Sequence, residues 1–275
     1  MARPFGWIHS IDILDDVWLA EPTTVRFSRC NLFVGANGIG KTHFISLLSG
    51  LASPSKVMER AGPPDSTVHA VINWYDPQPR RAEFRAGGKQ LYFASDGATV
   101  PFIPQPYRVV RPLDHWGSLP RNLRELAEAV SLDRWAIRKL IESLPEIVQG
   151  AVKRTWIENE RIRAEYIRGD SLVTDSGPRQ ILDNIVTLEV LVAIAETYAR
   201  TQPTLLLLDS LFNGTYDEYV HATDLLSSSV RGFQTVATAI DVAPSPPPEW
   251  TVTRFVYLDR SSYKRWARLV QDDME

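Results

Sequence analysis

A glycine-rich segment near the N-terminus has the residue types that bind a chain of phosphates. Residues 35–42 read Gly-Ala-Asn-Gly-Ile-Gly-Lys-Thr and match the pattern Gly-x-x-x-x-Gly-Lys-[Ser/Thr]. Gly35, Gly38 and Gly40 allow the backbone to turn sharply and to approach phosphate oxygens closely. The N–H groups of such a loop point at the anion from the start of a helix, where the helix dipole also favours negative charge. The segment therefore predicts a site for a triphosphate.

Two side chains at the end of this loop add a positive charge and a metal ligand. Lys41 reaches the β- and γ-phosphates, and the Thr42 hydroxyl is a ligand for Mg²⁺. His43 follows them, either as a further nucleotide contact or as local packing at the loop. The alternative for the whole segment is a glycine-rich turn with an exposed lysine. The nucleotide-binding candidates are Gly35, Ala36, Asn37, Gly38, Ile39, Gly40, Lys41, Thr42 and His43.

An acidic residue at the end of a neighbouring strand is the second part of such a site, because it holds the magnesium ion from the other side. The best candidate is Asp209, which directly follows the unbroken apolar run 204–208. A run of this kind is typical of a central parallel strand. We expect the Asp209 carboxylate to hold Mg²⁺ through a water molecule, with an ordinary aspartate at a strand end as the alternative.

The elements that must position these residues follow from hydrophobic periodicity. An apolar helix is expected over 178–200, with Ser176 as its N-cap and Gly177 in its first turn. A second helix is expected after Lys41, directly behind the glycine loop. The other predicted elements are strands within 24–34, 67–112, 204–208, 233–240 and 251–258, helices within 119–149, and a hairpin over 151–173 that turns at 158–160. Strands that alternate with helices favour an α/β sheet.

The segment 35–42 resembles the Gly-x-Asn-Gly-x-Gly-Lys-[Ser/Thr] loop of ABC-type ATPases, most of all that of the SMC, RecF and OLD-like heads. The segment 174–180, Thr-Asp-Ser-Gly-Pro-Arg-Gln, is similar to a diverged form of that family's serine–glycine signature. The resemblance implies a P-loop NTPase fold of the ABC-ATPase type. A mixed central sheet would be flanked by helices, with an antiparallel β subdomain and a small helical insertion. It also implies one domain over 1–275, with 113–173 as a helical and hairpin insertion within it.

The same resemblance implies ATP and Mg²⁺ as ligands and a dimer that encloses two nucleotides. Each ATP would contact the P-loop of one copy and Ser176, Gly177 and Gln180 of the other. A second helix N-terminus meeting the γ-phosphate agrees with this arrangement. Gln105 is a candidate for the family's magnesium-sensing glutamine, with a glutamine in a surface loop as the alternative.

Two catalytic positions depart from the family pattern. The family has a glutamate after the strand-end aspartate, where it polarises the attacking water, but this chain has Ser210. The position of the family's switch histidine corresponds to about Ile240, which cannot donate a hydrogen bond to a phosphate. General-base assistance contributes about 10²- to 10⁴-fold to a rate, so we expect slow or absent hydrolysis. A misalignment at one of the two positions is the alternative.

The overall composition excludes several classes of protein. Hydrophobic residues make up 44% and charged residues 23% of the 275 residues, which excludes a disordered or collagen-like chain. Cys30 is the only cysteine, so an internal disulfide and a cysteine-based zinc site are excluded. No run reaches the roughly 18 apolar residues of a membrane-spanning helix, and the N-terminus lacks a signal pattern. The expected compartment is the cytoplasm.

A local basic patch is where a nucleic acid would bind, because a net charge of −3 gives no global basic field. Alternate residues of a hairpin share a face and could line a nucleic-acid track. The alternative is a solvated hairpin whose cations are balanced by nearby glutamates, and 263–268 raises the same question. The patch consists of Lys153, Arg154, Arg161, Arg163 and Arg168 with Trp156 and Tyr166, and the balancing acids are Glu158, Glu160 and Glu165.

These features together predict an ATP-binding head that dimerises on nucleotide and acts as a switch for a separate effector protein, for example a nuclease. Analogy with the family gives DNA maintenance or anti-phage defence as the context. Two alternatives stay open. One is an active ATP hydrolase coupled to a transport or DNA-processing partner, and the other is a non-catalytic scaffold that nucleotide stabilises.

Overall fold

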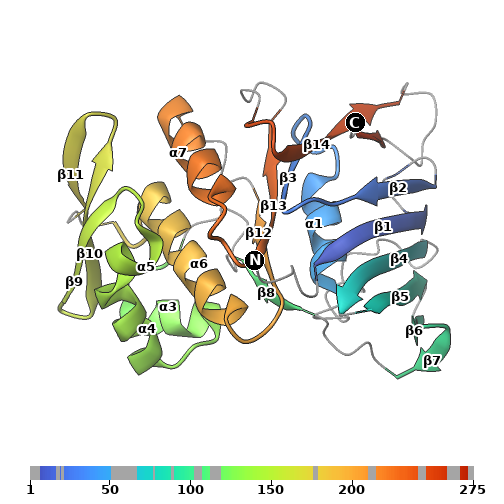
Figure 1. Cartoon of the computed structure of the whole chain (residues 1–275), viewed down its shortest axis with the longest axis horizontal. Helices are drawn as coiled ribbons and strands as arrows, with labels where there is room; N and C mark the ends of the chain where they lie inside the picture. The colour runs from blue at the N-terminus through green and yellow to red at the C-terminus, as the bar shows by residue number, and fades with distance from the viewer. Residues whose placement is uncertain are drawn as a thin grey trace.

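A mixed six-stranded sheet forms the centre of the molecule and carries the glycine loop (Figure 1). The computed structural model of the chain describes residues 7–16, 19, 22–50, 67–76, 78–87, 90–101, 107–111, 119–175, 179–209, 215–240, 246–258 and 267–271. The central strands run in the order β15–β14–β3–β13–β12–β8. They are β3 (Cys30–Val34), β8 (Arg108–Val110), β12 (Thr204–Leu208), β13 (Gln234–Ala239), β14 (Trp250–Tyr257) and β15 (Ala267–Gln271). Neighbouring strands are parallel except β14 with β15, so the carboxyl ends of the parallel strands meet at one edge.

The central sheet separates two hydrophobic cores. Along β12 the side chains alternate, so that Leu206 and Leu208 belong to the core of helix α6 (Asn184–Ala199). Leu205 and Leu207 belong to the opposite core, which contains helix α1 (Lys41–Gly50). All five residues of β12 are buried, because both faces of a parallel strand are covered in an α/β sheet. The apolar run 204–208 is therefore a central strand, as predicted.

A second sheet, antiparallel throughout, shares the core of α1 (Figure 1). Its strands run in the order β2–β1–β4–β5–β6–β7. They are β1 (Ile8–Asp15), β2 (Thr23–Arg26), β4 (Thr67–Asp76), β5 (Gln78–Gly87), β6 (Gln90–Ser95) and β7 (Ala98–Val100). Buried residues such as Ile11, Val68 and Phe84 face this core. The antiparallel β subdomain expected from the resemblance is thus present.

Helices and a three-stranded sheet form the opposite end of the molecule, beyond α6 (Figure 1). The helices are α3 (Leu123–Val130), α4 (Arg134–Glu142) and α5 (Leu144–Val148), and α7 (Tyr216–Ser227) lies alongside α6. The strands β9 (Val152–Glu158), β10 (Arg161–Arg168) and β11 (Ser171–Asp175), here called the hairpin sheet, pair in the order β11–β10–β9. The predicted turn lies between β9 and β10, where Asn159 and Glu160 have φ of 49° and 61°. Within the described part of the chain, no helix combines the length and the apolar character needed to cross a membrane.

The predicted start of the long apolar helix is wrong. α6 begins at Asn184 rather than near 178, and its N-cap is Asp183, whose side chain accepts a hydrogen bond from the Ile185 N–H at 3.1 Å. The segment around Ser176 that was expected to cap the helix lies several residues earlier, and 176–178 is outside the described residues. Ser176 is therefore not the N-cap of this helix.

Pairing with another segment explains this late start. The N–H of Arg121 donates to the carbonyl of Gln180 at 2.8 Å, and the N–H of Leu182 donates to the carbonyl of Leu119 at 2.9 Å. These backbone groups are already satisfied in an extended conformation and are not free to form a helix. Aspartate is also among the strongest N-cap residues, so the helix begins at the first position after this pairing.

Arg121 holds this junction together, and we expect its replacement to destabilise the fold strongly. It is 1% exposed, and its guanidinium forms an ion pair with the Asp175 carboxylate and donates to the carbonyls of Asp175 and Ile181 at 2.9 and 3.2 Å. Arg121→Met leaves a carboxylate without its partner and should lower the free energy of unfolding by about 3–5 kcal/mol. Arg124→Met is the control, because the Arg124 side chain is 78% exposed and pairs only at the surface, with Glu128. Urea denaturation of both variants measures the difference, and equal midpoints would contradict this role of Arg121.

Candidate functional site

The glycine loop lies between β3 and α1, in the predicted order of strand, loop and helix. Every residue of β3 is buried, which fixes the start of the loop. The Gly35 N–H donates to the carbonyl of Ala239 on β13 at 3.3 Å, and the Phe44 N–H donates to Gly40 at 3.0 Å as α1 begins. Gly38 and Gly40 have φ of 79° and 111°, values that favour glycine. The loop therefore turns in the way that brings backbone N–H groups to the start of a helix.

Lys41 places a positive charge at this loop. The residue is 8% exposed, and its ammonium donates to the carbonyls of Gly35 and Ala36 at 2.6 and 2.9 Å. The side chain thus folds back over the loop instead of extending into solvent. This burial disagrees with the alternative of a glycine-rich turn with an exposed lysine. A cation held beside the N-terminus of a helix is the environment that a phosphate chain requires. The residues at the loop therefore fit a polyphosphate.

Aromatic packing holds α1 at the loop. The ring of Phe44 lies 4.5 Å from that of Phe33 on β3 and 6.1 Å from that of Phe255 on β14, measured between centroids. Ile39 is 1% exposed and fixes the middle of the loop in the same core. These contacts position the first turn of α1, including Lys41, by burial in the core.

Gly35 has no room for a side chain, and we expect Gly35→Ala to destabilise the loop. A Cβ there would lie 2.8 Å from Phe255 Cβ and 3.1 Å from Ile39 Cγ2. Overpacking of a dense core costs about 1–3 kcal/mol. Gly232→Ala is the matched control, because its nearest neighbour, Ala199 Cβ, is at an ordinary 3.4 Å. Thermal or urea unfolding should show a loss of stability in Gly35→Ala and not in Gly232→Ala. Equal losses of stability in the two variants would contradict the argument from steric overlap.

Asp209 lies at the same edge of the sheet as the loop. It directly follows β12, is half-buried, and its Oδ1 accepts a hydrogen bond from Thr238 Oγ1 on β13 at 2.8 Å. Because β13 separates β12 from β3, the two strand ends are about 10 Å apart at the usual spacing of strands. Thr42 is exposed in the first turn of α1. A hydroxyl and a carboxylate on two sides of a phosphate chain fit the oxygen ligands that Mg²⁺ prefers.

His43 contacts an acidic residue of the same chain. Its Nε2 lies 2.8 Å from Oδ2 of Asp16, which is 2% exposed and whose Oδ1 accepts from the Leu19 N–H at 3.1 Å. This contact fits the interpretation of His43 as local packing at the loop.

The remaining predicted site residues are only partly described. Ile240 follows β13 directly and is half-buried, between the ends of β3 and β12. An apolar side chain thus stands where the resemblance implies a switch histidine. Gln180 is exposed, and its carbonyl is paired with Arg121. Ser176, Gly177, Ser210 and Gln105 lie outside the described residues.

The basic residues of the hairpin sheet mostly contact other groups of the same fold. The Lys153 ammonium donates to the carbonyl of Gly150, and the guanidinium of Arg154 stacks over Trp156. The others bind acids or carbonyls: Arg161 the carbonyl of Arg179, Arg163 the carboxylate of Glu158, and Arg168 the carboxylates of Asp183 and Glu218. This arrangement fits a solvated, charge-balanced hairpin.

Cys30, in β3, is buried, and burial raises its thiol pKa to about 11. A thiol in this state is inert at neutral pH, because the thiolate is the nucleophile. Among the described residues, no group of three or more histidine, cysteine, aspartate or glutamate side chains could hold a metal ion.

Sequence reasoning missed a polar cluster between α6, α7 and the hairpin sheet. Glu189, in the middle of α6, is 0% exposed and lies 3.2 Å from Nε2 of His221 on α7. The pattern contained one signal, because Glu189 interrupts a run of residues from Ile185 to Ala195 that are otherwise almost all apolar. A charged residue in such a run is rarely buried without a partner.

Comparison with known proteins gives a match of structure without a match of sequence. No protein-family model matches the chain, and no curated protein sequence does. The SMC head bound to the C-winged helix domain of ScpA has a TM-score of 0.63 at 14% identity, over 98% of each chain. The SMC head domain from Thermotoga maritima has a TM-score of 0.59 at 14% identity, over 97% of this chain and 99% of that one. The recombination mediator RecF in its ATP form has a TM-score of 0.56 at 11% identity, over 90% and 96%.

These likenesses extend over nearly the whole chain. At such low identities they concern the fold alone. The chain has the fold of an SMC- and RecF-like ABC-type ATPase head.

Proposed function

We propose that this protein binds ATP with Mg²⁺ at the glycine loop. The observation that carries the proposal is Lys41, whose ammonium is held at the loop by the carbonyls of Gly35 and Ala36, beside the first turn of α1. Backbone N–H groups of 35–40 would surround the phosphates, and Thr42 and Asp209 would hold the metal ion. The structure of RecF, which has the same fold, is named as a complex with ATP. The metal neutralises the charge of the phosphates when it is bound.

We further propose that two copies associate around the nucleotide. The resemblance assigns Ser176, Gly177 and Gln180 to contacts with the ATP of a partner copy. Because α6 begins at Asn184, the N–H groups at its first turn belong to residues from Asn184 onward rather than to this segment.

We propose weak or absent hydrolysis for the bound ATP. Ile240, at the edge of the sheet between the ends of β3 and β12, has no group that can hydrogen-bond to a phosphate. Ser210 follows Asp209 and offers only a neutral hydroxyl in place of a base. Binding without rapid turnover suits a switch, because a ligand shifts a conformational equilibrium by its differential affinity for the two states.

The partner of the switch would be a separate protein. The solved neighbours include an SMC head bound to a domain of ScpA, which is a protein assembly, and the recombination mediator RecF of the RecFOR pathway. By analogy, we propose an effector protein in DNA maintenance or in anti-phage defence, for example a nuclease. A direct contact with nucleic acid through the hairpin sheet is less favoured, because Arg163 and Arg168 form ion pairs with acids of the same fold.

Light scattering after gel filtration tests the proposed dimer. The chain alone should elute as a monomer, and ATP with Mg²⁺, or a non-hydrolysable analogue, should convert it to a dimer. EDTA added with ATP is the control and should prevent the change. A mass that stays the same with nucleotide, in a chain shown by calorimetry to bind ATP, would contradict the dimer and support a nucleotide-stabilised scaffold.

A further inference from the structure

Glu189 is a buried acid that connects α6 to the start of the hairpin sheet. Its Oε1 accepts hydrogen bonds from the N–H groups of Ala151 and Val152, at 2.6 and 3.1 Å. A Cβ on Gly150 would lie 2.3 Å from the same oxygen, so only glycine leaves room for the carboxylate there. Burial of a carboxylate is costly unless its charge is compensated. The segment 150–152 thus accommodates this acid, with a glycine that leaves space for the carboxylate and two N–H groups that donate to it.

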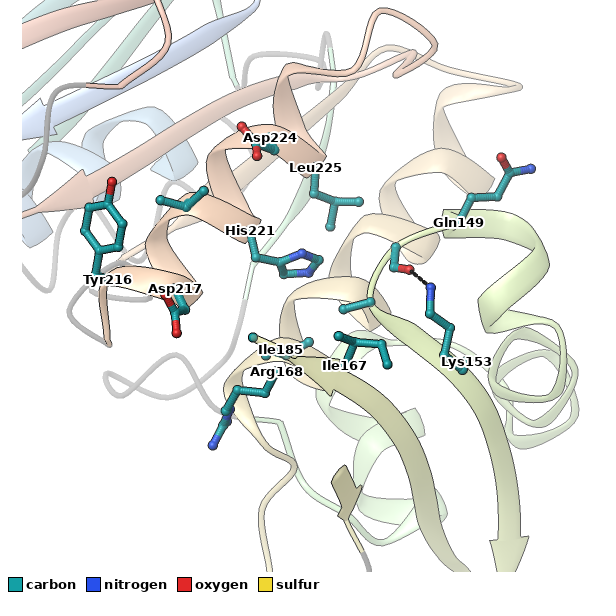
Figure 2. A pocket seen from close by; sticks show the side chains of 14 residues that line it. Gln149, Lys153, Ile167, Arg168, Ile185, Tyr216, Asp217, His221, Asp224 and Leu225 are labelled. Carbon is teal, nitrogen blue, oxygen red and sulfur yellow. Dashed lines mark hydrogen bonds between the residues drawn. The ribbon is translucent and has the colours of Figure 1, made fainter. Parts of the chain in front are cut away.

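His221 brings α7 to the same carboxylate. Its Nε2 lies 3.2 Å from Glu189 Oε1, and its side chain is 21% exposed. Figure 2 shows His221 reaching from α7 toward Ile167 and Ile185, between the helix and the hairpin sheet. One buried acid therefore contacts three elements: its own helix α6, the start of β9 through the N–H groups of Ala151 and Val152, and α7 through a close approach of the His221 ring nitrogen that does not have the geometry of a hydrogen bond.

A cavity separates α7 from the hairpin sheet beside this contact. It has a volume of about 610 Å³ and is lined by residues of both sides, including Gly150, Arg168, Tyr216 and His221 (Figure 2). On its other side, Arg168 of β10 donates to Asp183 at the start of α6 and to Glu218 of α7, at 2.8 and 3.1 Å. Space between two elements allows them to shift, whereas a packed core resists such a change.

We infer that Glu189 is a positioning residue that ties α7 to the hairpin sheet and couples the movement of the two. The coupling to nucleotide rests on the proposed function, in which Asp209 holds the metal ion, because α7 begins seven residues later, at Tyr216. A change at the magnesium-side acid when ATP binds would shift α7. Glu189 would carry that shift to β9, because its carboxylate accepts hydrogen bonds from Ala151 and Val152 and lies against His221 of α7.

Hydrogen exchange of the full chain without nucleotide tests the link by itself. His221→Asn should speed exchange in Tyr219–Leu226 by about tenfold while Ala151 and Val152 stay protected, because Glu189 still binds them. Glu189→Gln should speed exchange in both places, because a neutral amide is a weaker acceptor than a carboxylate. Asp224→Asn is the control, since it changes another acid of α7 that lines the same cavity. Unchanged exchange of α7 in both variants would overturn the inference.

Exchange with ATP and Mg²⁺ tests the coupling. In the unchanged chain, protection gained in 35–50 and α7 should extend to Val152–Glu158. In Glu189→Gln the protection of 35–50 and of α7 should remain, and the protection of Val152–Glu158 should be lost. Protection of β9 in that variant equal to that in the unchanged chain would contradict the role of Glu189. Failure of ATP to protect 35–50 would contradict both the proposed function and the coupling. The exchange experiment without nucleotide tests only whether Glu189 links α7 to the hairpin sheet.

Discussion

Lys41→Ala is expected to lower the affinity for ATP by at least about a hundredfold, because it removes a cation that makes charge-assisted hydrogen bonds to phosphate oxygens. In the structure this ammonium lies at the loop, bound to the carbonyls of Gly35 and Ala36. Isothermal titration calorimetry with ATP and Mg²⁺ measures the change.

Two variants separate the charge from its surroundings. Lys41→Met keeps most of the aliphatic stem, so it should lose the same affinity with less effect on packing. Lys139→Ala is the matched control, because its ammonium stacks over Trp135 on α4, at the other end of the molecule. A melting temperature that rises with ATP in the unchanged chain and not in Lys41→Met gives an independent readout. Equal affinity in the unchanged chain and Lys41→Ala would refute the proposed site.

Ser210→Glu is expected to raise ATP turnover by about 10²-fold, near the lower limit of general-base assistance. A carboxylate after Asp209 would orient and polarise the attacking water, which the serine hydroxyl does poorly. The gain stays near the lower limit because Ile240 still offers no hydrogen bond to the phosphate. Release of inorganic phosphate under saturating ATP measures the rate.

Matched variants decide whether the gain comes from a base. Ser210→Gln has a similar size without the charge and should leave the rate unchanged. Asp209→Asn combined with Ser210→Glu should remove the gain, since the metal ion would lose its second ligand. No increase in Ser210→Glu, in a variant that binds ATP normally, would show that the alignment of Asp209 and Ser210 with the family positions is wrong.

Local sequence patterns predicted the parts of the fold in which neighbours in sequence are also neighbours in space. The glycine loop followed by a helix, the central strand 204–208 and the hairpin turn at 158–160 all have this property. Their glycine positions and apolar spacing express constraints of one strand or one turn. The position of Asp209 at the edge that carries the loop follows from the same logic, because parallel strands end at a common edge.

Contacts between distant segments decided the rest. The periodicity of the apolar helix does not show where it begins, because residues 180–182 pair with 119–121 and Asp183 then caps the helix. A sequence pattern contains no information about which of these extended segments meet. His43 is a similar case, since its contact with Asp16 comes from a segment 27 residues earlier.

The sequence by itself determined the chemistry that a phosphate site needs, because glycine, lysine and threonine at fixed spacing have few other uses in combination. Only the tertiary structure decided how the polar cluster between α6, α7 and the hairpin sheet is assembled. Glu189 is one acid in an apolar helix until the fold brings the N–H groups of Ala151 and Val152 and the ring of His221 to its carboxylate. The physical reason is that the energy of a buried charge depends on its partners in space, which are far away in the chain.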